Sequence, residues 1–104
     1  MINERAYSKY FKAFGDPTRL RILALLSSKE MTVSEIVANI GLSQPTISRH
    51  LGILRDADVV HDRRDGQNVY YSINKASVEG CCRGFCDCLE IRIKTGQSKK
   101  KEKQ

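Results

Sequence analysis

Residues 32–54 read TVSEIVANIGLSQPTISRHLGIL, and this stretch decides the fold. It opens with the capping-box pattern T-x-x-E, which predicts a helix that ends at Gly41. Ser43 can cap a second helix, and Pro45 is tolerated in the first turn of that helix because no amide donor is needed there. Two helices joined by so short a glycine-containing turn are typical of a helix-turn-helix.

The second helix of this pair has an apolar side and a small polar side. Ile47, Leu51 and Leu54 repeat at helical spacing and predict the buried side. A helix facing only solvent would more often carry Glu and Lys on its other side, whereas short hydrogen-bonding groups let a helix enter the major groove of DNA and bond base edges. The residues expected to contact DNA from this helix are Ser43, Gln44, Thr46, Ser48, Arg49 and His50.

A β-hairpin is predicted directly after the helix pair. Alternate residues of the segment 69–73 are apolar, as in a half-buried strand, and Asp65-Gly66 is a strong hairpin-turn signal. A hairpin in this place is a wing, and Arg63 and Arg64 at its tip are expected to reach a phosphate or the minor groove. The plainer interpretation is an exposed turn with incidental arginines.

Helical spacing predicts three further helices around this unit. The first covers residues 3–15. The next begins at Pro17 after the cap residue Asp16, and its many apolar positions predict a central, buried helix. The last is predicted over residues 75–95 after the cap residue Asn74. The expected fold class is therefore mostly α with a small β-hairpin wing.

The composition is that of one small domain. The chain has 104 residues and a net charge of +6, and we expect a domain over residues 1–95 followed by a basic, disordered tail at 96–104. The tail is expected to be a solubilising segment or a weak phosphate-binding arm. No apolar run approaches the roughly 20 residues of a membrane span, and the polar start is not a secretory signal, so we expect a cytoplasmic protein with no membrane partner. No Ser/His/Asp grouping, phosphate-binding glycine loop or paired-carboxylate cleft indicates an enzyme.

All four cysteines of the chain lie within eight residues, too close together to cross-link a fold. In a cytoplasmic chain such a cluster indicates metal ligands or redox groups. On a straight helix Cys82 and Cys86 are neighbours, while Cys81 and Cys88 share another face about 10 Å apart along the axis. One ion therefore cannot be held by all four thiolates unless the helix bends.

The stretch FKAFGDPTRLRIL at residues 11–23 resembles the ArsR/SmtB family of bacterial winged-helix repressors. The stretch LSQPTISRHL at residues 42–51 and the wing resemble the same family, and the similarity covers roughly residues 5–95. The resemblance implies a homodimer built on the first and last helices. It also implies binding to operator DNA without inducer, and release when a metal or metalloid binds.

The family places its sensor sites in different helices, and two of these sites lack their ligands here. Hydroxyl residues stand at both cysteine positions of the family's soft-metal box, which matches residues 30–36, and the last helix has no histidine for a zinc site. Resemblance to the arsenic-responsive members implies that As(III), or alternatively Sb(III), binds to Cys81, Cys82 and Cys88, with Cys86 as the alternative ligand.

Bringing three of these thiolates together requires the last helix to bend, which Gly80 and Gly84 make inexpensive. Bending would shift the dimer packing and respace the two recognition helices, which must lie about 34 Å apart. Alternatives remain open at this point. One is a thiol-redox or persulfide-responsive repressor, in which a disulfide forms between Cys82 and Cys86 or between two subunits. Another is a repressor that senses Cd(II), Pb(II) or Zn(II). The last two are a thiolate metal-storage protein and a DNA-binding protein whose cysteines are only structural.

Overall fold

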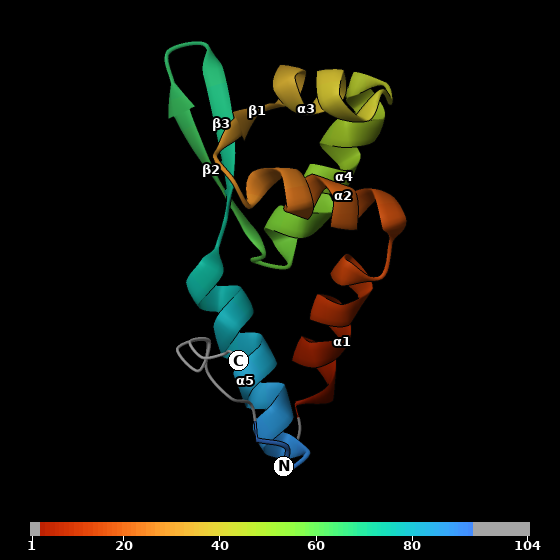
Figure 1. The fold of residues 1–104 in the computed structure, drawn as a ribbon, viewed down its shortest axis with the longest axis vertical. Coiled ribbons are helices and arrows are strands. Elements are labelled where there is room, and N and C mark those ends of the chain that lie inside the picture. Colours follow the sequence, from red (N-terminus) through yellow and green to blue (C-terminus); the bar gives the residue numbers. More distant parts are fainter. Residues whose placement is uncertain (1–2, 93–104) are drawn as a thin grey trace, which may run out of the picture.

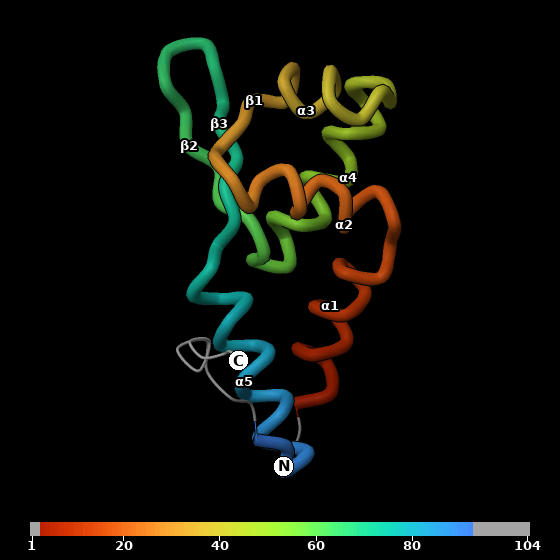
Figure 2. Tube along the Cα trace, viewed as in Figure 1, coloured from red at the N-terminus to blue at the C-terminus, as the bar shows by residue number. Residues whose placement is uncertain are grey.

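The computed structural model describes residues 3–92, which form a winged helix-turn-helix with two further helices packed beneath it (Figure 1). The elements in chain order are α1 (Glu4–Phe14), α2 (Pro17–Leu26), β1 (Met31–Thr32), α3 (Val33–Ile40), α4 (Gln44–Asp56), β2 (Val60–Asp65), β3 (Asn68–Ile73) and α5 (Lys75–Cys88). The trace in Figure 2 shows α1 and α5 descending together from the body formed by the other elements. This confirms the predicted fold class. None of the helices within residues 3–92 is long and apolar enough to cross a membrane.

The helix-turn-helix forms with the caps that the sequence predicts. The Thr32 hydroxyl accepts a hydrogen bond from the Glu35 amide at 3.2 Å, and the Glu35 carboxylate accepts one from the Thr32 amide at 2.9 Å. Gly41 ends α3 with φ +87°, a left-handed conformation that favours glycine. Ser43 then caps α4, so the two helices are joined by a turn of fixed geometry.

The core lies between the helix pair, α2 and the base of the hairpin. Ile47, Leu51 and Leu54 of α4 are fully buried, as the spacing predicts. Burial of such a side chain contributes roughly 1.5–3 kcal/mol, so the inner side of α4 is fixed against the core and its outer side is left for contacts with other molecules. The largest fully buried side chains are Ile22, Ile36, Ile47, Leu51, Leu54, Val59 and Val60.

The sheet has three antiparallel strands in the order β1-β3-β2. Strand β1 has no signal in the sequence, and its two residues pair with Tyr70 and Tyr71 of β3. Because β3 is thereby the central strand, all of residues 69–73 are half-buried, and the predicted alternation of burial is absent. Asp65 pairs with Asn68 across the turn, and Gly66 has φ +66°, as a two-residue hairpin turn requires.

Two predictions about helices need correction. The second helix is not buried all round, because Leu20 is 52 % exposed while Ile22 and Leu26 are buried. The last helix ends at Cys88 and not at residue 95, because Glu90 takes a left-handed φ of +60° and the Ile91 amide closes the end of the helix on the Cys86 carbonyl at 2.8 Å. The physical reason is that the apolar residues after Cys88 alternate and do not continue a helical stripe. Residues 93–95 and the predicted tail lie outside the described residues.

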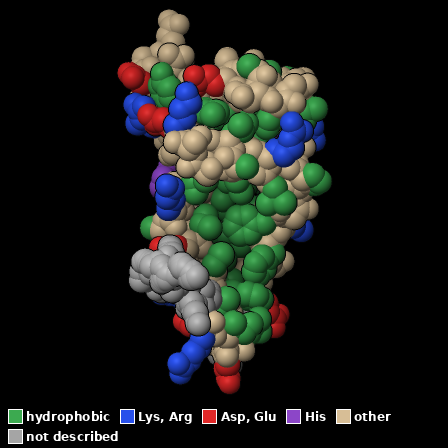
Figure 3. All heavy atoms as spheres, in the orientation of Figure 1, with side chains coloured by type: hydrophobic (Ala, Val, Ile, Leu, Met, Phe, Trp, Pro, Cys, Tyr) green, Lys and Arg blue, Asp and Glu red, His purple; other side chains and the backbone are tan. Residues whose placement is uncertain are grey.

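Helices α1 and α5 pack through aromatic and polar contacts. The Phe85 ring lies 5.4 Å from the ring of Tyr7 and 4.7 Å from that of Phe11. A hydrogen bond joins the hydroxyls of Tyr10 and Ser77. Hydrophobic side chains also gather on the molecular surface over these two helices (Figure 3). The pair is therefore one packed unit that still presents apolar surface outward.

Candidate nucleic-acid interface and thiol site

The amino-terminal half of α4 presents a small polar surface. Gln44, Ser48 and Arg49 are exposed there, as predicted. The Ser43 hydroxyl accepts a hydrogen bond from the Thr46 amide at 3.3 Å and donates one to the Thr46 hydroxyl at 2.9 Å. These two bonds fix the position of the Ser43 and Thr46 hydroxyls at the start of the helix. Donors and acceptors held in this way on one side of a helix can bond base edges in a major groove.

His50 is held differently from the other predicted DNA contacts. It is half-buried, and its Nδ1 lies 3.1 Å from an Nη atom of Arg19 and 3.9 Å from the carboxylate of Asp16. The Asp16 carboxylate caps α2, and the hydrogen bond from the Arg19 amide, helped by the charge of Arg19, holds the pKa of Asp16 below its usual value. One ring nitrogen of His50 is therefore engaged by α2.

The two wing arginines are not equivalent. Both Arg63 and Arg64 precede the turn at Gly66 by a few residues. The Arg63 guanidinium donates two hydrogen bonds to the Glu30 carboxylate, at 2.6 and 3.3 Å, and lies 4.8 Å from the centre of the Tyr70 ring. The hydrogen bond to Glu30 also raises the pKa of Arg63. Arg64 is exposed and lies opposite Val69, so it is the wing cation better placed for a phosphate.

The four cysteines divide between two sides of α5. Cys81 is buried, and this burial, with a smaller effect of Cys82, raises the pKa of the Cys81 thiol. Burial and the thiol of Cys88 raise the pKa of Tyr7, which places the Tyr7 hydroxyl beside Cys88. Cys81 and Cys88 therefore share the side of α5 that faces α1. Cys82 is exposed and follows a different side of the helix with the half-buried Cys86.

The Tyr7 hydroxyl lies directly over Gly84. A Cβ atom at position 84 would lie only 2.7 Å from the Tyr7 hydroxyl oxygen, whereas a Cβ at Gly80 would meet nothing within 4 Å. Gly84 stands between Cys81 and Cys88 along the same side of the helix. The close approach of α1 to the inner thiols thus depends on the missing side chain at Gly84.

The predicted triad of Cys81, Cys82 and Cys88 is not assembled in the structure. None of the four cysteines forms a disulfide, and within residues 3–92 no three Cys, His, Asp or Glu side chains are grouped as a metal site. This follows from the geometry of α5, which is continuous through Cys88 and keeps the thiols on different sides. Three-thiolate binding would need a rearranged helix.

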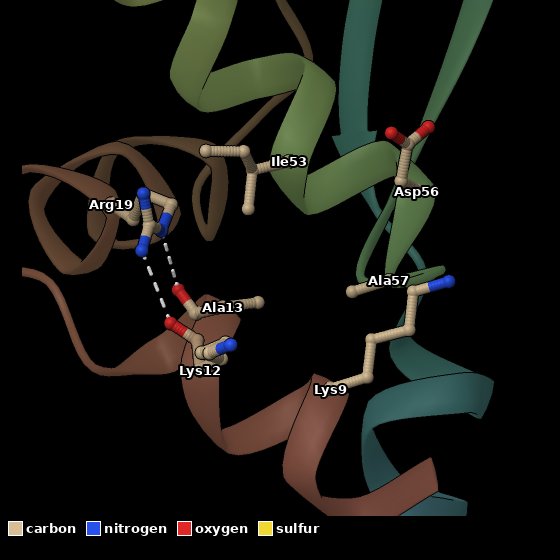
Figure 4. Close-up of a pocket in the computed structure, with 7 residues that line it drawn as sticks. All are labelled: Lys9, Lys12, Ala13, Arg19, Ile53, Asp56 and Ala57. Carbon is tan, nitrogen blue, oxygen red and sulfur yellow. Dashed lines mark hydrogen bonds between the residues drawn. The ribbon is translucent and has the colours of Figure 1, made fainter. Parts of the chain in front are cut away.

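A cavity of about 300 Å³ lies between α1 and α4, beside Arg19 (Figure 4). The figure shows the Arg19 guanidinium reaching the backbone carbonyls of Lys12 and Ala13, the last turn of α1. Hydrogen bonds from Arg19 of α2 therefore hold the carboxyl end of α1 beside this partly open cavity. The lining residues are Lys9, Lys12, Ala13, Arg19, Ile53, Asp56 and Ala57.

The helix-turn-helix, its polar outer side and the wing define the class of winged helix-turn-helix transcriptional regulators. The model of the arsR family of bacterial regulatory proteins matches residues 16–62. The chain is 50 % identical over 64 residues to the transcriptional repressor SdpR of Bacillus subtilis, covering 62 % of this chain and 71 % of that relative. The chain belongs to the ArsR family.

Further relatives agree with this assignment. The arsenic resistance transcriptional regulator ArsR1 of Pseudomonas putida is 46 % identical over 65 residues, which cover 62 % of this chain and 51 % of that relative. A solved structure described as a possible transcriptional regulator for arsenical resistance superposes with a TM-score of 0.68 at 33 % identity, over 79 % of this chain and 84 % of that one. The relatives named here are transcriptional regulators, which is a non-enzymatic role.

Sequence reasoning missed three residues that organise these sites. Arg19 lies in the stretch that carries the family resemblance, but its bonds to α1 and α4 have no local signal. Glu30 meets Arg63 across 33 positions of the chain. Tyr7 lies within the first predicted helix, but its place beside the thiols depends on how α1 packs on α5.

Proposed function

We propose that this chain is a homodimeric repressor that binds operator DNA through α4 and the wing and releases it when trivalent arsenic or antimony binds the α5 thiolates. The observation that carries the first half is the outer side of α4, where Gln44, Ser48 and Arg49 stand exposed on a helix whose inner side is fully buried. Ser43, Thr46 and the wing residues Arg63 and Arg64 complete the proposed surface, and the half-buried His50 lies behind it.

The proposed dimer uses α1 and α5. The apolar residues Phe11, Leu89 and Ile91 are between 41 % and 50 % exposed on or beside these helices. Apolar surface of this kind, gathered on one face, favours a second copy of the chain as its cover. A twofold dimer would present two α4 helices to successive turns of DNA, as operator binding requires.

The proposed inducer site is Cys81, Cys82 and Cys88, with Cys86 as the alternative ligand. Each of three thiols would displace one hydroxyl group of arsenous acid, so that three As–S bonds form and each thiol proton leaves with a hydroxyl group as water. Soft thiolates suit this ion. Because the reduced helix keeps the three thiols apart, binding would have to bend α5 near Gly80 and Gly84, and would draw Cys81 and Cys88 away from Tyr7. The proposed result is a displacement of α1 and loss of the operator-binding geometry.

The test is release of operator DNA, measured by fluorescence anisotropy while arsenite, antimonite, Cd(II) or a mild oxidant is added with and without reductant. We expect arsenite to release the wild-type protein in the presence of reductant. Cys82→Ser should bind the operator with unchanged affinity and lose the response.

Four results would contradict this proposal in different ways. An unchanged arsenite response in Cys82→Ser would remove that residue from the site. Release by oxidant alone would favour a redox sensor using the Cys82 and Cys86 pair, and release by Cd(II) alone would favour a metal sensor. A protein that binds thiophilic metals but no DNA would instead be a thiolate storage protein.

A further inference from the structure

The Arg19 guanidinium makes three hydrogen bonds, two to α1 and one to α4. Its Nε donates to the Ala13 carbonyl at 2.8 Å, and one Nη donates to the Lys12 carbonyl at 3.1 Å. Both carbonyls belong to the last turn of α1, and the Lys12 carbonyl also accepts a hydrogen bond from the Gly15 amide at 3.2 Å. The other Nη lies 3.1 Å from Nδ1 of His50, in the middle of α4. A single guanidinium therefore joins α1 to the proposed recognition helix.

The contact with Arg19 determines which ring nitrogen of His50 accepts a hydrogen bond. A guanidinium can only donate hydrogen bonds, so Nδ1 of His50 accepts and the ring carries its proton on Nε2. Asp16 completes the arrangement, because its carboxylate accepts from the Arg19 amide at 3.1 Å and lies 3.9 Å from the same histidine nitrogen. The imidazole is thus held against α2 through Nδ1.

Because a cavity lies beside Arg19, the hydrogen bonds of Arg19 have a large influence on the angle between α1 and α4. The cavity of about 300 Å³ lies between α1 and α4, lined by the apolar side chains of Ala13, Ile53 and Ala57 (Figure 4). A cavity provides no close-packed contact to resist a change of angle between two helices. At its other end α1 is packed on α5, with Tyr7 over Gly84.

We propose that Arg19 is a positioning residue for DNA binding: by clamping the carboxyl end of α1 to His50, it sets the angle of α4 to the dimer helices and so the spacing of the two recognition helices. This inference rests on the proposed binding of operator DNA by α4. It assigns His50 a structural role within the clamp in place of the base contact that the sequence predicted. It also defines the joint through which a displacement of α1 would reach α4.

The experiment compares Arg19→Gln with Arg21→Gln, which removes the same charge from an exposed position of the same helix. Both are titrated by fluorescence anisotropy against a duplex selected by the wild-type protein from a random pool, against the same duplex with one base pair added between its half-sites, and against unrelated DNA. We expect Arg19→Gln to lose at least tenfold more affinity for the selected duplex than Arg21→Gln does. We also expect it to lose discrimination between the two half-site spacings.

Two further readouts separate positioning from direct contact. Loss of a phosphate contact lowers the salt slope by about 0.9, so equal salt slopes for the two variants on unrelated DNA support a clamp. Arg19→Gln combined with His50→Asn should bind no more weakly than the worse of the two single variants, because both break the same contact. Additive losses would show that His50 contacts DNA itself and would overturn the inference.

Other outcomes also decide between the two proposals. Equal losses in Arg19→Gln and Arg21→Gln, with spacing discrimination retained, would overturn the clamp while leaving operator binding intact. A wild-type protein that selects no sequence would overturn operator binding and the clamp together. Circular dichroism checks that the variants fold. If Arg19→Gln does not fold, Arg19→Lys keeps the charge, cannot make the three bonds, and should show the same loss of spacing discrimination.

Discussion

At the scale of single residues, the two glycines of α5 have different surroundings. Gly80 faces open space, whereas a Cβ at Gly84 would lie 2.7 Å from the Tyr7 hydroxyl oxygen. Alanine favours a helix over glycine by about 1 kcal/mol where space allows. The same substitution should therefore have opposite consequences at positions separated by one helical turn.

We expect Gly80→Ala to raise the free energy of unfolding by about 1 kcal/mol and Gly84→Ala to give no such gain, because its methyl group must displace Tyr7. Tyr7→Phe removes the obstructing oxygen, and the next ring atom lies at 3.9 Å, an ordinary contact distance. In that background Gly84→Ala should recover the gain. Urea unfolding of the single and double variants measures this. An equal gain at both positions in the wild type would show that Tyr7 does not rest on Gly84.

The sequence supports residue-level predictions only where the cause is local. Thr32 and Ser43 cap their helices as predicted because each bonds an amide three residues away. The role of Arg19 could not be predicted in this way, because its partner His50 is 31 positions distant. The cysteine cluster and the division of its thiols between two faces of a helix are visible in the sequence, but which of the two faces packs toward α1 depends on the tertiary fold.

At the scale of elements, the wing is braced against the start of β1. Arg63 reaches from β2 to Glu30 and stacks over Tyr70, so its charge is partly neutralised in the protein without DNA. A second exposed pair, Arg83 with Glu79, lies on α5 at 2.5 Å. Both are exposed Arg–Glu pairs, one at the wing and one on α5, so the second pair is a control for the first.

We expect Glu30→Gln to strengthen binding to unrelated DNA and to steepen its salt dependence, by about one released counterion for each subunit, because Arg63 becomes available to phosphates. Glu79→Gln changes the net charge equally and should leave the salt slope unchanged. Exposed ion pairs contribute at most about 1 kcal/mol, so both variants should remain folded. Anisotropy titrations between low and moderate salt measure the slopes. Identical slopes would mean that Arg63 does not approach DNA.

Elements with strong periodicity and caps are predicted from the sequence, and short or terminal ones are not. The helix pair has helical periodicity and caps, the hairpin has alternating apolar residues and a turn signal, and both form as predicted. The strand β1 has two residues and exists only because β3 offers a free edge. The sequence predicts an α5 that is too long, because Leu89 and Ile91 are apolar and no glycine marks the end of the helix. The left-handed residue that ends it is Glu90.

At the scale of the whole molecule, the balance of charge differs from what the total implies. The net charge is +6, but residues 43–68, which include α4 and the wing, contain four arginines and four aspartates. Two of those arginines, Arg55 and Arg63, are paired with Asp62 and Glu30. Because one copy of the chain presents few unpaired cations on α4 and the wing, high-affinity operator binding should require a dimer.

The last prediction therefore concerns the dimer. Leu89 is 49 % exposed at the end of α5, and Leu42 is 39 % exposed in the turn before α4, so Leu→Glu can be compared at two exposed positions. We expect Leu89→Glu to shift the protein toward monomer, because a charge buried in the proposed interface without a partner is costly. Its operator affinity should fall with the loss of the second half-site. Leu42→Glu should sediment as the wild type does. If both variants sediment as dimers with unchanged operator affinity, the apolar surface over α1 and α5 is not the interface.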